Sequence, residues 1–430
     1  MHSSPPNFHD VHPSFGEAFR FWLKLGWISF GGPTGQIAIM QTELVEKKRW
    51  ISQSHFLHAL NYCMLLPGPE AQQLTIYIGW LLHGVAGGIA AGALFVLPSV
   101  SILWLLSYVY AAWGTIPALA AVFYGLKPAV MAIVAAAALR LGAKTLRNAV
   151  LWSFAGLAFV GLYFFHAPFP LIIAAAALGG WAARRVWPDK MTLPSHGPTA
   201  PADHGRGAKP SLSRAARVIA LHLALWWGPL VAAGVLLGWQ HTIVREGIFF
   251  SKAAMITFGG AYAVLPYIAQ QAVENQGWLS QSQMMDGLGL AETTPGPLIM
   301  VVQFVGFMGA WNHPQGLSPL TAATLGALMI TWVTFVPCFL WIFLGAPHVE
   351  QMRGNATLTA ALSGVTAAVV GVILNLAVWF GVHALFPAGR LDGFVLVVSM
   401  VALVGLHRWK WDVVGVVLGC GLLGLIYSCL

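Results

Sequence analysis

SFGGPTGQ, at residues 29–36, returns as TFGGAYAV, at residues 257–264, an offset of 228 residues (257 minus 29). LPGPEAQQL, at residues 66–74, returns at the same offset as TPGPLIMVV, at residues 294–302. Further aligned pairs are Phe21 with Phe249, Glu46 with Glu274, and Trp50 with Trp278. Shared hydrophobicity would not align charged residues and tryptophans, so the repeated strings identify an internal duplication.

The composition indicates a membrane protein. Hydrophobic residues make up 58% of the 430-residue chain and charged residues only 8%, against about 25% charged in soluble domains. The apolar runs at residues 85–110, 116–139 and 218–239 reach the roughly 20 residues that a spanning helix needs. The predicted fold class is therefore an all-α integral membrane protein with two homologous halves.

Loop charge gives each half an orientation. Residues 140–147 carry three cations, and the segment 184–217 carries more. Both are expected in the cytoplasm, where loop Lys and Arg are retained. Residues 140–147 align with 379–386, which has no Lys or Arg, at an offset that becomes 239 (337 minus 98) after an insertion near residues 311–318. Likewise, Lys47-Lys48-Arg49 aligns with Asn275-Gln276-Gly277. This alternation predicts an inverted repeat, with the run 218–239 as the odd crossing.

Seven segments follow from these boundaries. They are a polar tail at 1–14, a first transporter repeat at 15–147, a connecting helical hairpin at 148–187, a cytoplasmic linker at 188–214, a linking transmembrane helix at 215–240, a second inverted repeat at 241–386 and a C-terminal helical hairpin at 387–430.

Gly and Pro interrupt apolar helical segments at matching places in the two halves. These four breaks are Gly31-Gly32-Pro33 and Pro67-Gly68-Pro69 in the first half and Gly259-Gly260 and Pro295-Gly296-Pro297 in the second. Pro cannot continue a helix, and Gly permits tight reversals. Paired breaks in inverted halves point to a transport site. Each break is expected to expose backbone N–H groups at membrane depth, which together with the helix dipole favour an anion. The alternatives are helix capping for Glu70, packing for the Gly and Pro residues, and lysines that extend to the membrane surface.

The candidate substrate-binding residues are those at the breaks and the polar residues around them: Lys24, Gly31, Gly32, Pro33, Thr34, Gln36, Pro67, Gly68, Pro69, Glu70, Gln72, Lys252, Gly259, Gly260, Tyr262, Glu292, Thr294, Pro295, Gly296 and Pro297. The further candidates for proton coupling are Glu43, Glu46 and Glu274, since acids inside a membrane are costly unless functional. The four cysteines form no C-x-x-C pair, and neither a metal nor another cofactor is expected.

The strings resemble those of the chromate ion transporter family in its long, two-domain form. The resemblance rests on FGGPTGQIA (30–38), LPGPEAQQL (66–74), FGG (258–260), Gly277-Trp278 and TPGP (294–297), and it covers residues 15–144 and 249–381. It implies efflux of chromate from the bacterial cytoplasm, giving resistance. The second half departs from the first, with Ala261 in place of Pro33 and Glu292 in place of Met64, so the halves are expected to differ in role.

Several alternatives stay open at this stage. Sulfate is a tetrahedral dianion like chromate, and no residue pattern separates the two. A membrane-embedded enzyme is disfavoured, because no nucleophile elbow, metal-ligand spacing or nucleotide-binding motif is present. The expected partners are a small inorganic oxyanion and the lipid bilayer, without nucleic acid, and a homodimer is left open. The expected location is the bacterial inner membrane.

Overall fold

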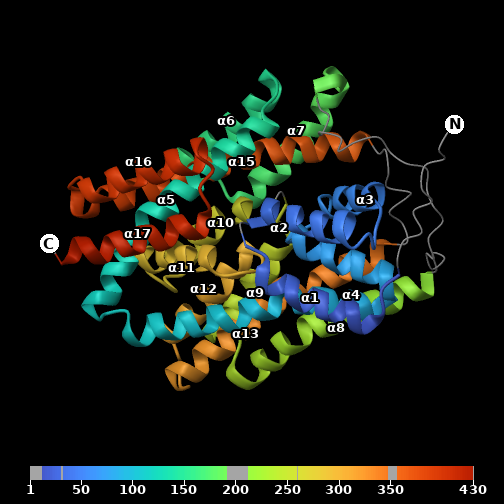
Figure 1. Cartoon of the computed structure of the whole chain (residues 1–430), viewed down its shortest axis with the longest axis horizontal. Coiled ribbons are helices and arrows are strands. Elements are labelled where there is room, and N and C mark those ends of the chain that lie inside the picture. Colours follow the sequence, from blue (N-terminus) through green and yellow to red (C-terminus); the bar gives the residue numbers. More distant parts are fainter. Residues whose placement is uncertain (1–11, 31, 191–211, 259, 347–355, 430) are drawn as a thin grey trace.

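The computed structural model describes residues 12–30, 32–190, 212–258, 260–346 and 356–429. Every regular element in these ranges is helical (Figure 1). Six helices are long and apolar enough to cross a membrane: α4 Glu70–Trp113, α5 Pro117–Thr145, α7 Phe169–Val186, α8 Leu212–Leu237, α13 Pro319–Gly345 and α15 Ala356–Leu385. The multi-pass membrane fold expected from the composition is confirmed.

The duplication recurs element by element. Before α4 and α5, the first half contains α1 Phe15–Ile28, α2 Gly32–Gln41, the π-helix η1 Thr42–Lys47 and α3 Gln53–Cys63. The second has α9 Thr242–Met255, α10 Ala261–Ala269, the π-helix η3 Gln270–Asn275, α11 Gln281–Thr293, the 3-10 turn η4 Leu298–Met300 and α12 Val301–Asn312. Even the two π-helices, a rare element, match residue for residue at the offset of 228.

A sharp reversal divides α4 into two limbs. His83 and Gly84 have non-helical backbone angles, and Gly84 has a φ of 62°, which favours glycine. Beyond it the chain turns back on itself. The backbones of Gly79 and Gly87 lie so close together that a Cβ on Gly79 would overlap the carbonyl oxygen of Gly87. The limb before the reversal, residues 70–82, is therefore too short to span a membrane. The second half makes the same reversal between α12 and α13, where Gly306 and Gly326 approach closely.

Each half carries a helical hairpin that packs on the other half. The first hairpin, α6 Ala149–Tyr163 with α7, covers α15, while α16 Gly393–Arg408 and α17 Val413–Ser428 cover α5. The crossings use equivalent glycines: Gly125 of α5 lies against Gly424 of α17, and Gly364 of α15 lies against Gly180 of α7. Small residues let membrane helices approach closely, so each hairpin packs tightly on the other half and holds the two halves together.

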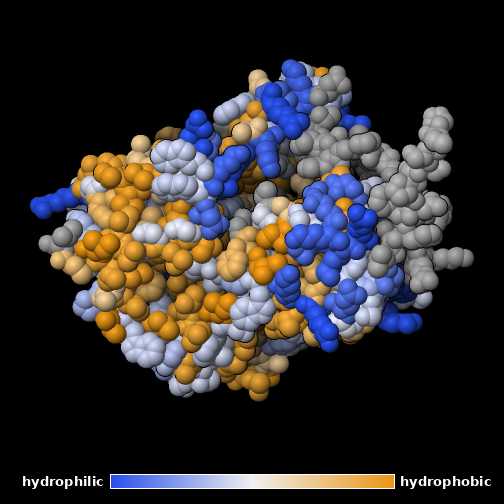
Figure 2. All heavy atoms as spheres, in the orientation of Figure 1, coloured by the Kyte–Doolittle hydropathy of each residue, from blue (hydrophilic) through white to orange (hydrophobic). Residues whose placement is uncertain are grey.

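The remaining elements are a helix without a counterpart and two short turns. Helix α8 packs on α9 and α13, and the 3-10 turns are η2 Pro188–Lys190 and η6 Pro387–Gly389. Figure 2 shows hydrophobic residues covering much of the face over α13, α16 and α17, with hydrophilic residues gathered over α3. Exposed leucines such as Leu157 (71%) and Leu418 (64%) belong in lipid rather than water.

Candidate functional site

The four breaks meet through a reciprocal pair of backbone hydrogen bonds. The N–H of Gly68 donates to the carbonyl oxygen of Thr257 at 2.8 Å, and the N–H of Gly296 donates to that of Ser29 at 2.7 Å. Both donors and both acceptors are related by the offset of 228. Each Pro-Gly-Pro segment of one half is therefore bonded to the residue before the Phe-Gly-Gly of the other.

Side chains at the two crossings obey the same symmetry. Gly68 and Gly296 have φ angles of 119° and 97°, which favour glycine. A Cβ on Gly68 would lie 3.0 Å from Sγ of Cys338, and one on Gly296 would lie 2.9 Å from Cβ of Ser99. Ser99 and Cys338 are equivalent at the offset of 239. The expectation that every break offers free N–H groups is wrong for these two glycines, because each N–H is used between the halves.

The helix turns beside the crossings are the other places where backbone donors are expected. Helix α4 begins after Pro69 and α10 after Gly260, and neither start has a side-chain cap. Helix α2 begins at Gly32, and its Gln36 amide donates to the carbonyl oxygen of Gly296 at 2.5 Å. The first turn of a helix leaves N–H groups without intrahelical partners. The helix starts, rather than the Pro-Gly-Pro glycines, can therefore hold an anion.

Buried polar atoms without partners gather at the same place. Among the described residues, Oε1 of Gln36, Gln72 and Gln73 and Oγ of Ser99 are buried and accept or donate no hydrogen bond. All four side chains are at most 1% exposed. Buried polar groups are nearly always bonded in native proteins, so this concentration marks a region where water or a polar ligand belongs.

The two halves differ at the starts of α2 and α10. The carboxylate of Glu70 lies beside α10, with its Oε1 3.1 Å from the position that a Cβ on Gly260 would take. The equivalent of Glu70 is Leu298, and no described residue lies within 4 Å of a Cβ on Gly32. The Glu70 carboxyl thus occupies the space beside the start of α10, while no described residue occupies the corresponding space at α2.

A tyrosine–carboxylate pair connects the two breaks of the second half. The hydroxyl of Tyr262, in the first turn of α10, donates to Oε1 of Glu292 at 2.6 Å. The charge of Arg140, near the end of α5, acts on both. Sequence reasoning assigned Arg140 to a cytoplasmic loop and not to the site. Nearby, Thr294 binds the carbonyl oxygen of Ala291, and Pro295, Gly296 and Pro297 are buried.

The remaining binding candidates are placed differently. Lys24 and Lys252 are exposed, as the alternative of surface-reaching lysines requires. Gly31, Gly259 and the side chain of Thr34 fall outside the described part of the structure. Pro33 and Pro67 are half-buried beside their glycines.

The three further acids expected for proton coupling lie near the surface. Glu43 forms an ion pair with Lys47 at 2.7 Å, and this hydrogen bond keeps the pKa of Glu43 below its usual value. Glu46 is exposed, and exposed Glu274 accepts a hydrogen bond from the Trp379 indole at 2.9 Å. Their surroundings are not those of buried, functional acids.

Two buried acids were missed by sequence reasoning. Glu246 in α9 is 0% exposed, and Asp286 in α11 is 4% exposed. Asp286 accepts a hydrogen bond from the Tyr110 hydroxyl at 2.8 Å. Both acids lie in short, weakly apolar helices, and this is the one feature of the sequence that points to them. Their burial depends on which other helices pack over them.

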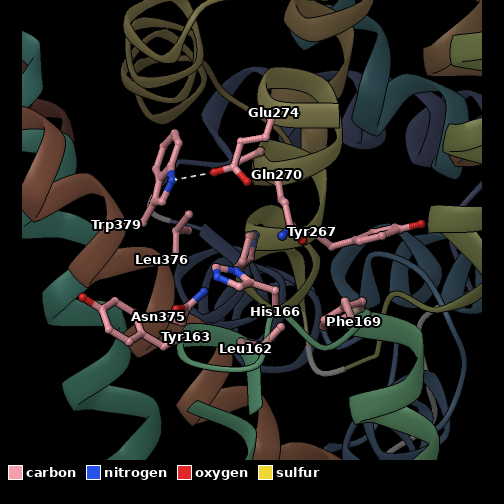
Figure 3. Close-up of a pocket in the computed structure, with 12 residues that line it drawn as sticks. Leu162, Tyr163, His166, Phe169, Tyr267, Gln270, Glu274, Asn375, Leu376 and Trp379 are labelled. Carbon is pink, nitrogen blue, oxygen red and sulfur yellow. Dashed lines mark hydrogen bonds between the residues drawn. The ribbon is translucent and has the colours of Figure 1, made fainter. Parts of the chain in front are cut away.

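A cavity of about 380 Å³ lies between α6–α7, α10–η3 and α15. Figure 3 shows the side chains of His166, Gln270 and Asn375 at its centre and the Glu274–Trp379 bond at one edge. The loop charges predict that this cavity opens on the outer side. No Lys or Arg is among its lining residues, so it lacks the charge complement of an anion site.

Comparisons with known proteins agree on one family. A profile of the family described as "Chromate transporter" matches residues 16–181 and 246–425, so each match includes a hairpin. The chain is 32% identical over 425 residues to the "Chromate transport protein" of Pseudomonas aeruginosa, covering 96% of this chain and 92% of that one. It is 28% identical over 409 residues to the "Probable chromate transport protein" of Synechococcus elongatus, covering 93% and 92%. No solved structure matches.

Proposed function

The chain belongs to the chromate transporter family, and from this membership we propose that it carries chromate out of the cytoplasm across the inner membrane of a bacterium. It is a multi-pass membrane transporter of an oxyanion. The observation that carries the proposed site is the reciprocal bonding of Gly68 to Thr257 and of Gly296 to Ser29. It supports a substrate site at the crossing, because it gathers all four breaks in one place.

Within the crossing, the first turn of α2 is the proposed anion site. No described residue lies within 4 Å of a Cβ on Gly32, and the N–H groups of a first helical turn together with the positive helix end attract a tetrahedral dianion. Gln36 extends from the same helix to the second Pro-Gly-Pro segment. At α10 the Glu70 side chain occupies the equivalent place, so we expect one substrate for each protein molecule.

Two glycines with positive φ angles allow a paired test of this site. Gly32 (φ 69°) and Gly84 (φ 62°) both lack a described neighbour within 4 Å of a Cβ, and alanine in such a backbone conformation costs about 1–3 kcal/mol. Gly32→Ala places a methyl group in the proposed site and is expected to raise the KM for chromate severalfold. Gly84→Ala should lose similar stability and keep its KM. Equal KM values in the two variants would contradict the site.

Substrate and direction need separate measurements. In proteoliposomes we expect counterflow of chromate, with sulfate, molybdate and phosphate as competitors. Chemical conversion of chromate without accumulation would indicate an enzyme, and counterflow of sulfate alone would reassign the substrate. Everted membrane vesicles test direction: an exporter accumulates chromate in them. The usual inside-negative potential favours outward movement of a dianion.

A further inference from the structure

Glu246 is enclosed in a niche that leaves its carboxyl without a polar partner. Both carboxyl oxygens are buried and form no hydrogen bond with any described residue. The side chain projects from the second turn of α9 against Gly309 of α12. A Cβ on Gly309 would overlap Oε1 of Glu246 and lie 3.1 Å from Cβ of Trp278. The absence of a side chain at Gly309 thus makes room for the carboxyl.

The helices around the niche supply no countercharge. Helices α12 and α13 contain no Asp, Glu, Lys, Arg or His. Helix α8 reaches this level of α9 through Leu230, which lies against Gly247. Its charged or titratable side chains, Arg214, Arg217 and His222, lie toward the other end, two or more turns away, and His222 bonds the carbonyl oxygen of Val218.

The nearest titratable groups on α9 and the adjoining loops are directed elsewhere. Arg245 bonds Gln276, and Lys252 is exposed. Nδ1 of His241 accepts from the Ile243 N–H, while the His313 ring bonds the carbonyl oxygen of Gly277. An ionised, unpaired carboxylate in such a setting costs several kcal/mol. The Glu246 carboxyl is therefore protonated in this packing.

The first half shows that the packing itself does not require an acid. At the offset of 228, Glu246 is equivalent to Ala18 and Gly309 to Leu81. One aromatic contact beside this position is shared by the two halves: Phe21 packs on Trp50, as Phe249 packs on Trp278. A methyl group at Ala18 is also buried. The carboxyl of the second half is thus a chemical difference within a shared scaffold.

Building on the transport function proposed above, we propose that Glu246 is a proton-binding residue of the transport cycle. A carboxylate oxygen holds a proton while α9, α12 and the Trp278 segment are packed together. The proton is released to water when these elements separate and water reaches the carboxyl. Proton binding by Glu246 is in this way coupled to one of the rearrangements that transport requires.

The sign of the pH effect follows from linkage. Burial favours the protonated form, so the packed arrangement is most favoured below the ordinary pKa of a glutamate, about 4.3. The free-energy advantage of the packed arrangement falls as the pH rises above that value, because Glu246 loses its proton at a lower pH in the separated arrangement than in the packed one. One such group changes the equilibrium by at most about tenfold per pH unit.

The test compares the wild-type protein with Glu246→Gln, whose amide cannot ionise. Chromate exchange is measured in proteoliposomes with equal pH on both sides, from about pH 5 to about pH 8, a range that starts just above the ordinary glutamate pKa. Because protonation of chromate is common to both proteins, it cancels in the ratio of their rates. We expect this ratio to be near one at the acidic end and to change progressively with rising pH. The exposed Glu17→Gln variant is the control, with a ratio independent of pH.

A ratio that stays constant across the range overturns the inference, and so does a folded Glu246→Gln protein without exchange at any pH. Should Glu246→Gln fail to fold, Glu246→Ala with Gly309→Ala removes the carboxyl and fills the niche, with the same expected pH dependence. Absence of chromate exchange by the wild-type protein would instead contradict the proposed function. The two failures are thus distinguishable.

Discussion

Gly296→Ala is the substitution that most directly tests the crossing of the two halves. The φ of 97° at Gly296 costs a non-glycine residue about 1–3 kcal/mol. The added Cβ would also lie 2.9 Å from Cβ of buried Ser99 and 3.6 Å from the carbonyl oxygen of Phe95. Crowding of this kind costs about 1–3 kcal/mol more. The combined destabilisation is therefore about 2–6 kcal/mol.

A second substitution separates these two contributions. Ser99→Gly removes the Cβ that the new methyl group meets, so the double variant should regain the crowding part and keep the backbone part. Gly68→Ala should be milder than Gly296→Ala, because its nearest atoms are the side-chain ends of Gln73 and Cys338, at 2.9 and 3.0 Å. Gly419→Ala, with open space at its Cβ, is the control.

Thermal unfolding of the purified proteins in detergent gives the order of stability, and initial chromate uptake into everted vesicles gives the activity. We expect both to fall in the order wild type, Gly68→Ala, Gly296→Ala, with the Ser99→Gly double variant partly restored. Wild-type melting temperature and uptake in Gly296→Ala would refute the assignment of Gly296 to a tight interface between the halves.

Three further predictions concern orientation, surface charge and the exchanged hairpins. Reporter fusions should place residues 47–49 and 140–147 in the cytoplasm and residues 275–277 outside, and a cytoplasmic location of residues 275–277 would contradict the inverted repeat. Lys24→Gln and Lys252→Gln should keep chromate uptake within about twofold of the wild type, because both side chains are exposed and surface charges contribute little; a tenfold loss in either would return that lysine to the anion path. Gly125→Leu should lower the melting temperature markedly, since any side chain there overlaps the backbone of Cys420 in α17, whereas Gly156→Leu in α6, with no atom within 4 Å of its Cβ, should change it little.

The sequence by itself determined the membrane class, the duplication and the position of the breaks. These depend on local chemistry: apolar length for spanning, Pro and Gly for helix interruption, and the register of repeated residues. The offset of 228 that aligns Glu46 with Glu274 also relates η1 to η3 and α3 to α11. The same periodicity identified Gly68 and Gly296 as equivalent residues.

Tertiary structure decided what those equivalent residues do. Whether the Gly68 N–H is free or bonded to Thr257 depends on how two segments nearly 190 residues apart cross, and nothing in the local sequence specifies that. The exchange of hairpins, the open space at Gly32 against the filled space at Gly260, and the burial of Glu246 behind Gly309 are likewise packing outcomes. Hydropathy reports how costly it is to bury a residue, whereas only the assembled helices determine which residues are buried and which partners they meet.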